Sequence, residues 1–247
     1  MLQQERFDII SEILQKNSAV RVTELSDLLH VSESTIRRDI SDLEKAGRLK
    51  KVFGGAVAVS EDPSVSEKKP VPRSSINTDK KTLIARLAAS KIERGDFVYI
   101  DAGSTTGMML EHLPKDGVSY VTNGVDHALK MADRGLRVFT ISGLLKGRTE
   151  SLVGVDAVES IKKYNFSRSF MGTTGIDIKQ GFTTHDIEEA RVKAEAIERS
   201  GVTYILADSS KFGVVSSVSF APVSSGHIIT DRLPDEELRK YTEIEEV

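Results

Sequence analysis

One short helical segment carries side chains suited to contacts with nucleic acid. Helical spacing puts Ile36, Ile40 and Leu43 on one apolar face. The other face and its flanks carry hydroxyl and guanidinium groups, namely Ser34, Thr35, Arg37, Arg38 and Ser41. Such groups near the start of a helix can hold phosphates and reach base edges from the major groove of DNA. A DNA-binding helix is one interpretation. A solvated face of a three-helix bundle, or a protein-binding winged helix, is the alternative.

The residues around this segment predict a winged helix-turn-helix. Ser32 is placed to cap the helix and Gly47 to end it, and a very short break at residues 30–31 separates it from a preceding helical pattern. The run 48–57 predicts a small hairpin with a basic strand, which would serve as the wing. Residues 34–55 include six basic and three acidic side chains, a net charge of +3. Basic charge is therefore concentrated where the groove-facing elements are expected.

A second segment has the composition of an anion-binding turn. The apolar run 97–100 ends in Asp101, and residues 103–107 are Gly, Ser, Thr, Thr and Gly. Backbone N–H groups at the start of a helix, expected here over residues 108–113, favour an anion, and hydroxyl groups add donors. Gly103 would permit a close approach of the ligand. A tight strand-to-helix turn with hydroxyl caps remains the alternative interpretation.

The elements that would position this turn alternate between strands and helices. Short β-branched or aromatic runs occupy residues 97–100, 118–122, 138–141, 169–171, 203–207 and 227–230. Amphipathic helical stretches separate them, which predicts an α/β domain with a largely parallel sheet. Polar turns follow several of these runs, at 122–124, 142–143 and 207–211. Because ligands of open α/β sheets bind beyond the carboxyl ends of the strands, these turns are expected to converge on one crevice.

Proline and serine mark a division of the chain. Three of the six prolines fall at Pro63, Pro70 and Pro72, in a stretch rich in serine and charge. We expect a DNA-binding domain over residues 1–59, a linker over 60–79 and a ligand-sensing α/β domain over 80–247.

Composition excludes several classes of protein. The net charge of −3 means that DNA binding must depend on a local basic surface, and the lack of cysteine excludes disulfides and thiolate metal sites. The five histidines are scattered without metal-ligand spacing, so we expect neither a metal nor a cofactor. The first residues do not have the pattern of a signal peptide, and no apolar run is long enough to span a membrane. We expect a cytoplasmic protein.

The segment 31–57, VSESTIRRDISDLEKAGRLKKVFGGAV, resembles the signature region of the DeoR family of sugar-responsive repressors. Further blocks resemble the sensor domain of that family, in the order DAGSTT, TNG, SLVG, FMGTTGID, GFTT and LADSSKFG. The resemblance implies a fold similar to ribose-5-phosphate isomerase and a phosphorylated sugar as effector. It assigns DNA contacts to Ser34, Thr35, Arg37, Arg38, Lys50 and Lys51. It also suggests that Asp39 orders neighbouring arginines.

For the effector, the resemblance implies two groups of residues. Phosphate contacts are assigned to Gly103, Ser104, Thr105, Thr106 and Lys211, with Lys81 or Lys80. Sugar hydroxyls would be held, or the pocket shaped, by Asp101, Asn123, Gly143 and Asp208. Weaker candidates are Thr184, Glu188 and Lys193. The chain departs from the family at Ser142 and Lys146, where Gly and Arg are frequent, so the effector or its pose is expected to differ.

The function expected from these features is repression of a sugar-utilisation operon, with release from double-stranded operator DNA by a phosphorylated sugar, first of all fructose 1-phosphate. Tagatose 6-phosphate, glycerol 3-phosphate and deoxyribose 5-phosphate remain open. We expect a homodimer or homotetramer and no enzyme activity, because the turn 171–175, aligned with the acidic turn of the isomerase, has no carboxylate. The alternatives are a sugar-phosphate isomerase-like enzyme, or a winged-helix protein whose α/β domain only oligomerises.

Overall fold

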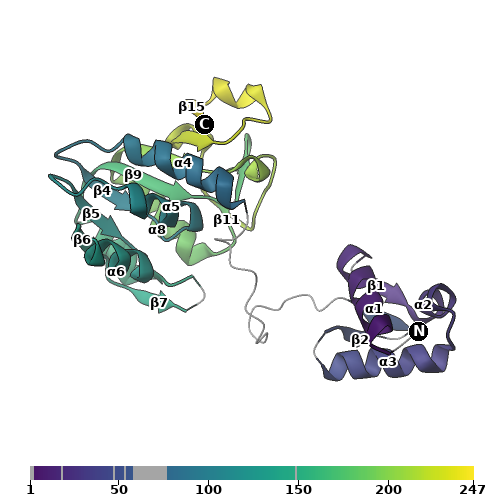
Figure 1. Ribbon diagram of the computed structural model, residues 1–247. Helices are drawn as coiled ribbons and strands as arrows, with labels where there is room; N and C mark the ends of the chain where they lie inside the picture. Colours follow the sequence, from purple (N-terminus) through teal and green to yellow (C-terminus); the bar gives the residue numbers. More distant parts are fainter. Residues whose placement is uncertain (1–2, 18, 47, 53, 58–76, 148) are drawn as a thin grey trace. The chain divides into compact units, whose positions relative to one another are not determined.

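The computed structural model describes the chain except for residues 1–2, 18, 47, 53, 58–76 and 148 (Figure 1). Contacts within the chain divide it into two compact units, Met1–Pro70 and Val71–Val247, called here the N-terminal and the C-terminal unit. Most of the linker expected over residues 60–79 lies outside the described residues. Helix α4 begins at Thr78, so the last two residues of the expected linker belong to this helix.

The N-terminal unit combines helices with a small antiparallel sheet. Its elements are α1 (Gln3–Asn17), β1 (Ala19–Arg21), α2 (Val22–Leu29), α3 (Glu33–Lys45), β2 (Lys50–Val52) and β3 (Gly55–Val57). The sheet order is β1-β3-β2, so the predicted basic hairpin is present and β1 extends it. Gly54 turns the hairpin at φ +81°, and a Cβ on Gly55 would lie 2.2 Å from the Val20 carbonyl oxygen. Glycine therefore lets β3 lie against β1.

The helix-turn-helix is held by an apolar core and a helix cap. The buried side chains include Ile10, Leu14, Leu25, Leu29, Ile36, Ile40 and Leu43. The predicted N-cap is confirmed, since the Ser32 hydroxyl oxygen accepts a hydrogen bond of 3.2 Å from the backbone N–H of Thr35. The predicted terminator, Gly47, lies outside the described residues. The apolar stripe of α3 thus faces the core, and its polar stripe is left at the surface.

A parallel sheet forms the centre of the C-terminal unit. Among the described residues its order is β15-β14-β12-β9-β4-β5-β6, and every neighbouring pair is parallel. Its strands are β4 (Phe97–Ile100), β5 (Ser119–Thr122), β6 (Arg137–Thr140), β9 (Phe166–Gly172), β12 (Ser200–Leu206), β14 (His227–Thr230) and β15 (Ile244–Glu246). The α/β fold with a parallel sheet is therefore confirmed.

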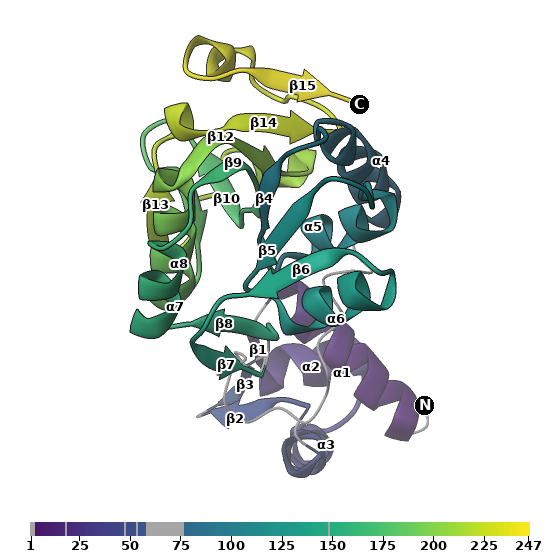
Figure 2. The same ribbon diagram turned by 90° about the vertical axis from the view of Figure 1, so that its left-hand side faces the viewer.

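Helices cover both faces of this sheet (Figure 2). One face carries α4 (Thr78–Ser90), α5 (Ser104–Met109) and α6 (Val125–Asp133), and the other carries α7 (Val155–Ile161) and α8 (Ile187–Glu198). Side chains alternate along β4, so Val98 and Ile100 pack in one core and Tyr99 in the other.

Smaller elements complete the unit. Beside the main sheet lie the hairpin of β7 (Leu144–Lys146) with β8 (Ser151–Val153), and an antiparallel sheet of β10 (Gly175–Asp177), β11 (Gly181–Thr184) and β13 (Val218–Ala221). The short helical turns are η2 (Leu110–His112), η3 (Ser209–Lys211), η4 (Val223–Ser225) and η5 (Glu236–Lys240). The antiparallel sheet was not predicted.

The helix expected over residues 108–113 begins earlier than predicted. Helix α5 starts at Ser104 and ends at Met109, and η2 continues it. The reason is local: the Thr106 hydroxyl accepts a hydrogen bond from the Gly103 N–H at 2.9 Å and donates to the Asp101 carbonyl at 2.5 Å. Ser104, Thr105 and Thr106 therefore form the first helical turn, and the Thr106 hydroxyl satisfies backbone groups that have no partner within the helix.

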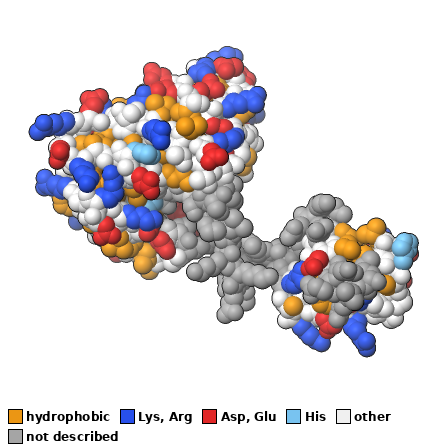
Figure 3. Space-filling model, viewed as in Figure 1, with side chains coloured by type: hydrophobic (Ala, Val, Ile, Leu, Met, Phe, Trp, Pro, Cys, Tyr) orange, Lys and Arg blue, Asp and Glu red, His pale blue; other side chains and the backbone are white. Residues whose placement is uncertain are grey.

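The surface of the C-terminal unit mixes both signs of charge. On the face shown in Figure 3, Lys and Arg side chains alternate with Asp and Glu. None of the helices that the structure describes has the length and apolar character needed to cross a bilayer.

Candidate nucleic-acid interface and effector site

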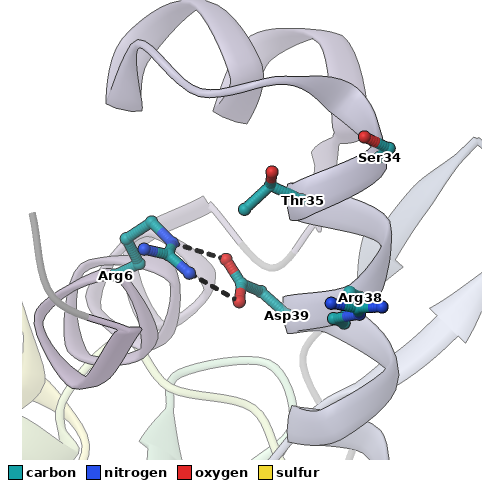
Figure 4. Close-up of a pocket in the computed structure, with 5 residues that line it drawn as sticks. All are labelled: Arg6, Ser34, Thr35, Arg38 and Asp39. Carbon is teal, nitrogen blue, oxygen red and sulfur yellow. Dashed lines mark hydrogen bonds and ion pairs between the residues drawn. The ribbon is translucent and has the colours of Figure 1, made fainter.

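The start of α3 presents a cluster of hydroxyl groups. The Ser32 hydroxyl lies 2.8 Å from that of Ser34 and 2.9 Å from that of Thr35. Ser34 is exposed and Thr35 half-buried, and Arg38 is exposed one turn further along the same stripe. The structure thus brings three of the predicted DNA contacts onto one surface, which Figure 4 shows. Hydroxyl donors and a guanidinium group suit both phosphates and base edges.

The other predicted DNA contacts lie beside this cluster. Arg37 forms an exposed ion pair of 2.9 Å with Glu33, and such pairs are weak, about 0.3–0.5 kcal/mol, so a phosphate can compete for Arg37. On the wing, the Lys51 ammonium donates to the Ser41 hydroxyl at 3.0 Å, which ties β2 to α3. The side chain of Lys50 lies outside the described parts of the chain.

Sequence reasoning missed Arg6, which the structure places at the same surface. Its guanidinium donates to the Asp39 carboxylate at 2.6 Å from Nε and 3.0 Å from Nη2 (Figure 4). Asp39 is 1% exposed, and the hydrogen bond to its carboxylate raises the pKa of Arg6 above the ordinary value of an arginine. The arginine that Asp39 orders thus comes from α1.

In the C-terminal unit, the predicted turn residues gather at the carboxyl end of β4. Ser104, Thr105 and Thr106 form the first turn of α5, and the Lys81 ammonium donates to the Ser104 hydroxyl at 3.3 Å. Lys81 comes from α4 and is only 5% exposed. A buried cation at the positive end of a helix favours an anionic ligand there.

Asp101 is paired with a lysine from α8. The Lys193 ammonium lies 2.5 Å from Asp101 Oδ2 and donates to the Gly172 carbonyl at 2.9 Å. The side chains of Lys193 and Asp101 are 8% and 6% exposed, so each charge is compensated by the other. The Gly172 N–H donates to the same carboxylate at 3.2 Å. Lys193, which the resemblance ranks only as a weaker candidate, therefore contacts both Asp101 and the end of β9.

The neighbouring strand end carries Asn123 and His127. The Asn123 side-chain carbonyl accepts a hydrogen bond of 2.9 Å from the Ala102 N–H, which fixes the turn after β4. His127 is buried, and its Nδ1 has no hydrogen-bond partner among the described residues. Burial lowers the pKa of His127, so the ring is neutral at pH 7. In the sequence, His127 is one of five histidines without metal-ligand spacing, and nothing there marked it as a site residue.

The turn after β12 holds Asp208 and Lys211. The Asp208 carboxylate accepts hydrogen bonds from the Ser210 N–H at 3.0 Å and from the Asn77 side chain at 3.2 Å. Lys211 is half-buried, and no side chain in the described part of the chain pairs with its ammonium group. Lys211 is therefore available to an anion.

The start of α4 contacts both the turn after β4 and the turn after β12. Asn77 contacts Asp208, the Lys80 ammonium lies 2.9 Å from the Ser209 hydroxyl and 2.7 Å from Asp231, and Lys81 reaches Ser104. Partial burial alone would raise the pKa of Asp231, but the hydrogen bonds from Lys80 and from Ser209 lower it.

Gly143 has a packing role in the structure. Its φ is +136°, and a Cβ would lie 2.7 Å from the Val153 carbonyl oxygen of β8. Lys146, on the following strand, lies 2.5 Å from the Asp186 carboxylate that caps α8. Partial burial alone would raise the pKa of Asp186, but the hydrogen bonds from Lys146 and from two backbone N–H groups lower it. Lys146 therefore anchors the hairpin to α8.

Comparison with known proteins matches both units. A DeoR-like helix-turn-helix domain matches residues 6–62, and a DeoR C-terminal sensor domain matches residues 76–232. The uncharacterized HTH-type transcriptional regulator FruR of Bacillus subtilis is 40% identical over 234 residues, 93% of this chain and 91% of the relative. The lactose phosphotransferase system repressor of Streptococcus mutans is 30% identical over 251 residues, 99% of each chain. Ribose 5-phosphate isomerase A of Methanocaldococcus jannaschii covers 55% of both chains at 14% identity, with a TM-score of 0.40.

A winged helix-turn-helix joined to an α/β sensor domain defines a class of DNA-binding transcriptional repressors. The chain belongs to the DeoR family of these regulators.

Proposed function

We propose that this protein represses a sugar-utilisation operon, and that a phosphorylated sugar releases it from the operator. Fructose 1-phosphate is the effector that we propose. The names of the relatives, among them FruR and a lactose phosphotransferase system repressor, support a role in sugar metabolism. Binding to chromosomal DNA also requires that the protein be cytoplasmic in a bacterial cell.

The observation that carries the effector proposal is the arrangement of charge at the carboxyl edge of the sheet. Lys81 lies at the first turn of α5 and Lys211 follows β12, so both cations belong to the same edge of the sheet. Carboxylates stand beside them at Asp101 and Asp208. Cations would bind the phosphate and carboxylates the sugar hydroxyls, the combination that a sugar phosphate requires.

The same residues support a sensor over an enzyme. Moving a proton between adjacent carbons needs a carboxylate that is free to act as a base. Residues 171–175 contain none, and the Asp101 carboxylate is held by Lys193 and by the Gly172 N–H. We propose binding without turnover, with no metal or cofactor.

The first turn of α4 offers a route from the effector to the DNA-binding unit. It follows directly on the residues that connect the two units, and it contacts both candidate phosphate-binding turns. A ligand between those turns would compete for Asn77, Lys80 and Lys81. We propose that this competition changes how α4 begins and thereby weakens operator binding, with a coupling of about 1–3 kcal/mol.

A repressor of this kind would act as a homodimer or homotetramer that places two α3 helices at operator half-sites. Exposed apolar side chains on the C-terminal unit support self-association, namely Leu144, Leu145, Val155 and Ile187.

A thermal-shift screen tests the effector. Fructose 1-phosphate at about 100 times its dissociation constant should stabilise the C-terminal unit by about 2.7 kcal/mol, whereas fructose and inorganic phosphate should not. Tagatose 6-phosphate, glycerol 3-phosphate and deoxyribose 5-phosphate belong on the same plate. A coupled assay of aldose–ketose interconversion should stay at background. Turnover would favour the isomerase interpretation, and no shift with any sugar phosphate would favour a domain that only oligomerises.

A further inference from the structure

The predicted DNA-binding surface has a second wall that comes from α1. A hollow of about 420 Å³ is lined by Arg6, Ser34, Thr35, Arg38 and Asp39 (Figure 4). Four of these residues belong to α3, and three of those four are predicted DNA contacts. Arg6 is the contribution of α1. The hollow is therefore part of the face that α3 turns toward DNA.

The ion pair between Arg6 and Asp39 fixes the orientation of the guanidinium group. Two hydrogen bonds, of 2.6 and 3.0 Å, hold the carboxylate and the guanidinium in a fork-to-fork arrangement. Asp39 lies on the apolar stripe of α3, three residues after Ile36, and is almost fully buried. Such a carboxylate cannot move out to solvent, so Arg6 is held at the edge of the hollow with a side-chain exposure of 12%.

The chemistry of the hollow suits a phosphate group. Arg6 and Arg38 contribute two positive charges and Asp39 one negative charge, which leaves +1. The hydroxyls of Ser34 and Thr35 add donors. Nε and Nη2 of Arg6 donate the two hydrogen bonds to Asp39, so the carboxylate fixes the plane of the guanidinium beside these hydroxyls. Guanidinium and hydroxyl donors around one concave spot match the oxygens of a single phosphodiester.

We propose that this hollow binds one backbone phosphate of the operator, with Arg6 as a direct phosphate contact and Asp39 as the positioning residue that aims it. The contact would fix how α1 and α3 sit on the duplex, while Arg38 reaches into the groove. A phosphate contact does not depend on the base sequence, so it should strengthen binding to specific and nonspecific DNA equally.

Salt dependence of DNA binding distinguishes a phosphate contact from a purely structural role. Each phosphate contact contributes about 0.9 to the slope of log affinity against log salt concentration. The full-length protein is titrated with a short labelled duplex over a series of salt concentrations. Arg6→Gln should lower the slope by about 0.9, so that over a fourfold rise in salt wild type loses about 3.5-fold more affinity than the variant.

Two further variants make the test decisive. Arg6→Gln leaves Asp39 buried without a partner, so the double variant Arg6→Gln/Asp39→Asn supplies a neutral hydrogen-bonding pair and the wild-type net charge. It should show the same lowered slope. The control Lys162→Gln removes one positive charge from the C-cap of α7 in the other unit, where Lys162 pairs with Glu159, and should keep the wild-type slope. Melting temperatures check that each variant is folded.

The opposite results are equally clear. If both Arg6 variants bind DNA more weakly by the same factor at every salt concentration, with the slope unchanged, Arg6 only positions α3 and the proposal is wrong. A free phosphate ion is tested at matched ionic strength. Should inorganic phosphate stabilise the wild-type N-terminal unit but not the double variant, while the slopes agree, the hollow binds the ion and not the DNA backbone.

Discussion

The two candidate sites handle charge in opposite ways. On the N-terminal unit, Arg37 and Arg38 are exposed, and Arg37 has only an exposed ion pair with Glu33. In the C-terminal unit, Lys81 and Lys193 are buried, and Lys193 is matched by Asp101 inside the fold. A site for a polymer must present charge to solvent, whereas a site for a small ligand can hold charge ready in a desolvated place. Stability and binding should therefore separate at the exposed arginines Arg37 and Arg38 and be coupled at the buried Lys193–Asp101 pair.

The largest expected effect is on the stability of the C-terminal unit. Lys193→Met leaves Asp101 buried without a partner and should lower the free energy of unfolding of that unit by about 3–5 kcal/mol. Urea unfolding measures it. The double variant Lys193→Met/Asp101→Asn should recover much of the loss, and the exposed-pair control Arg37→Met should change its own unit by less than about 1 kcal/mol. Equal losses for Lys193→Met and Arg37→Met would remove the contrast between the sites.

The next effect concerns the effector. Lys211→Ala removes a cation without a side-chain partner among the described residues, so the fold should keep its stability while sugar-phosphate affinity falls by about 1.5–3 kcal/mol, roughly 10- to 150-fold. Calorimetric titration with fructose 1-phosphate measures the loss. Operator affinity without effector should stay at the wild-type value. A variant that responds normally to the sugar phosphate would show that Lys211 lies outside the site.

An effect on operator affinity of similar size to that of Lys211→Ala on effector affinity is expected from Arg38. Arg38→Ala should weaken operator binding by about 1–3 kcal/mol, roughly 5- to 150-fold, because it removes an exposed guanidinium from the face of α3. Fluorescence anisotropy with the operator duplex measures it. The melting temperature and the affinity for sugar phosphate should remain those of the wild type. Loss of effector binding in this variant would mean that the two sites are not separate.

The smallest effect should fall on the coupling between the sites. Asn77→Ala removes the hydrogen bond from α4 to Asp208 and should reduce the coupling by about 0.5–2 kcal/mol, roughly 2- to 30-fold. The readout is the ratio of operator affinities without and with saturating fructose 1-phosphate. Lys91→Ala, at the other end of α4 and paired with Glu245, is the matched control. An unchanged ratio in Asn77→Ala would exclude this turn as the route.

Local patterns made much of the fold predictable. The runs 97–100 and 227–230 became β4 and β14 with the predicted bounds, because continuous apolar runs favour buried parallel strands. Ser32 also capped α3 as expected. The start of α5 was missed because Gly, Ser and Thr favour turns locally, and hydrogen bonds of Thr106 stabilise a helix there instead.

Ion pairs between residues far apart in the sequence could not be predicted. Arg6 lies four residues before the core residue Ile10, and Asp39 three after Ile36, so each charge falls on the apolar stripe of its helix. That anomaly is a signal that a buried pair exists, but the partner lies 33 residues away and only the packing of α1 on α3 identifies it. Asp101 and Lys193 are likewise 92 residues apart.

Operator affinity measured with and without fructose 1-phosphate tests the central claim most directly. The full-length protein is titrated against a labelled operator duplex at one fixed salt concentration, once without sugar phosphate and once with it at saturation. We expect the effector to weaken binding by about 1–3 kcal/mol, roughly 5- to 150-fold, and fructose with inorganic phosphate to leave it unchanged. Identical affinities in the presence and absence of every sugar phosphate would contradict the account.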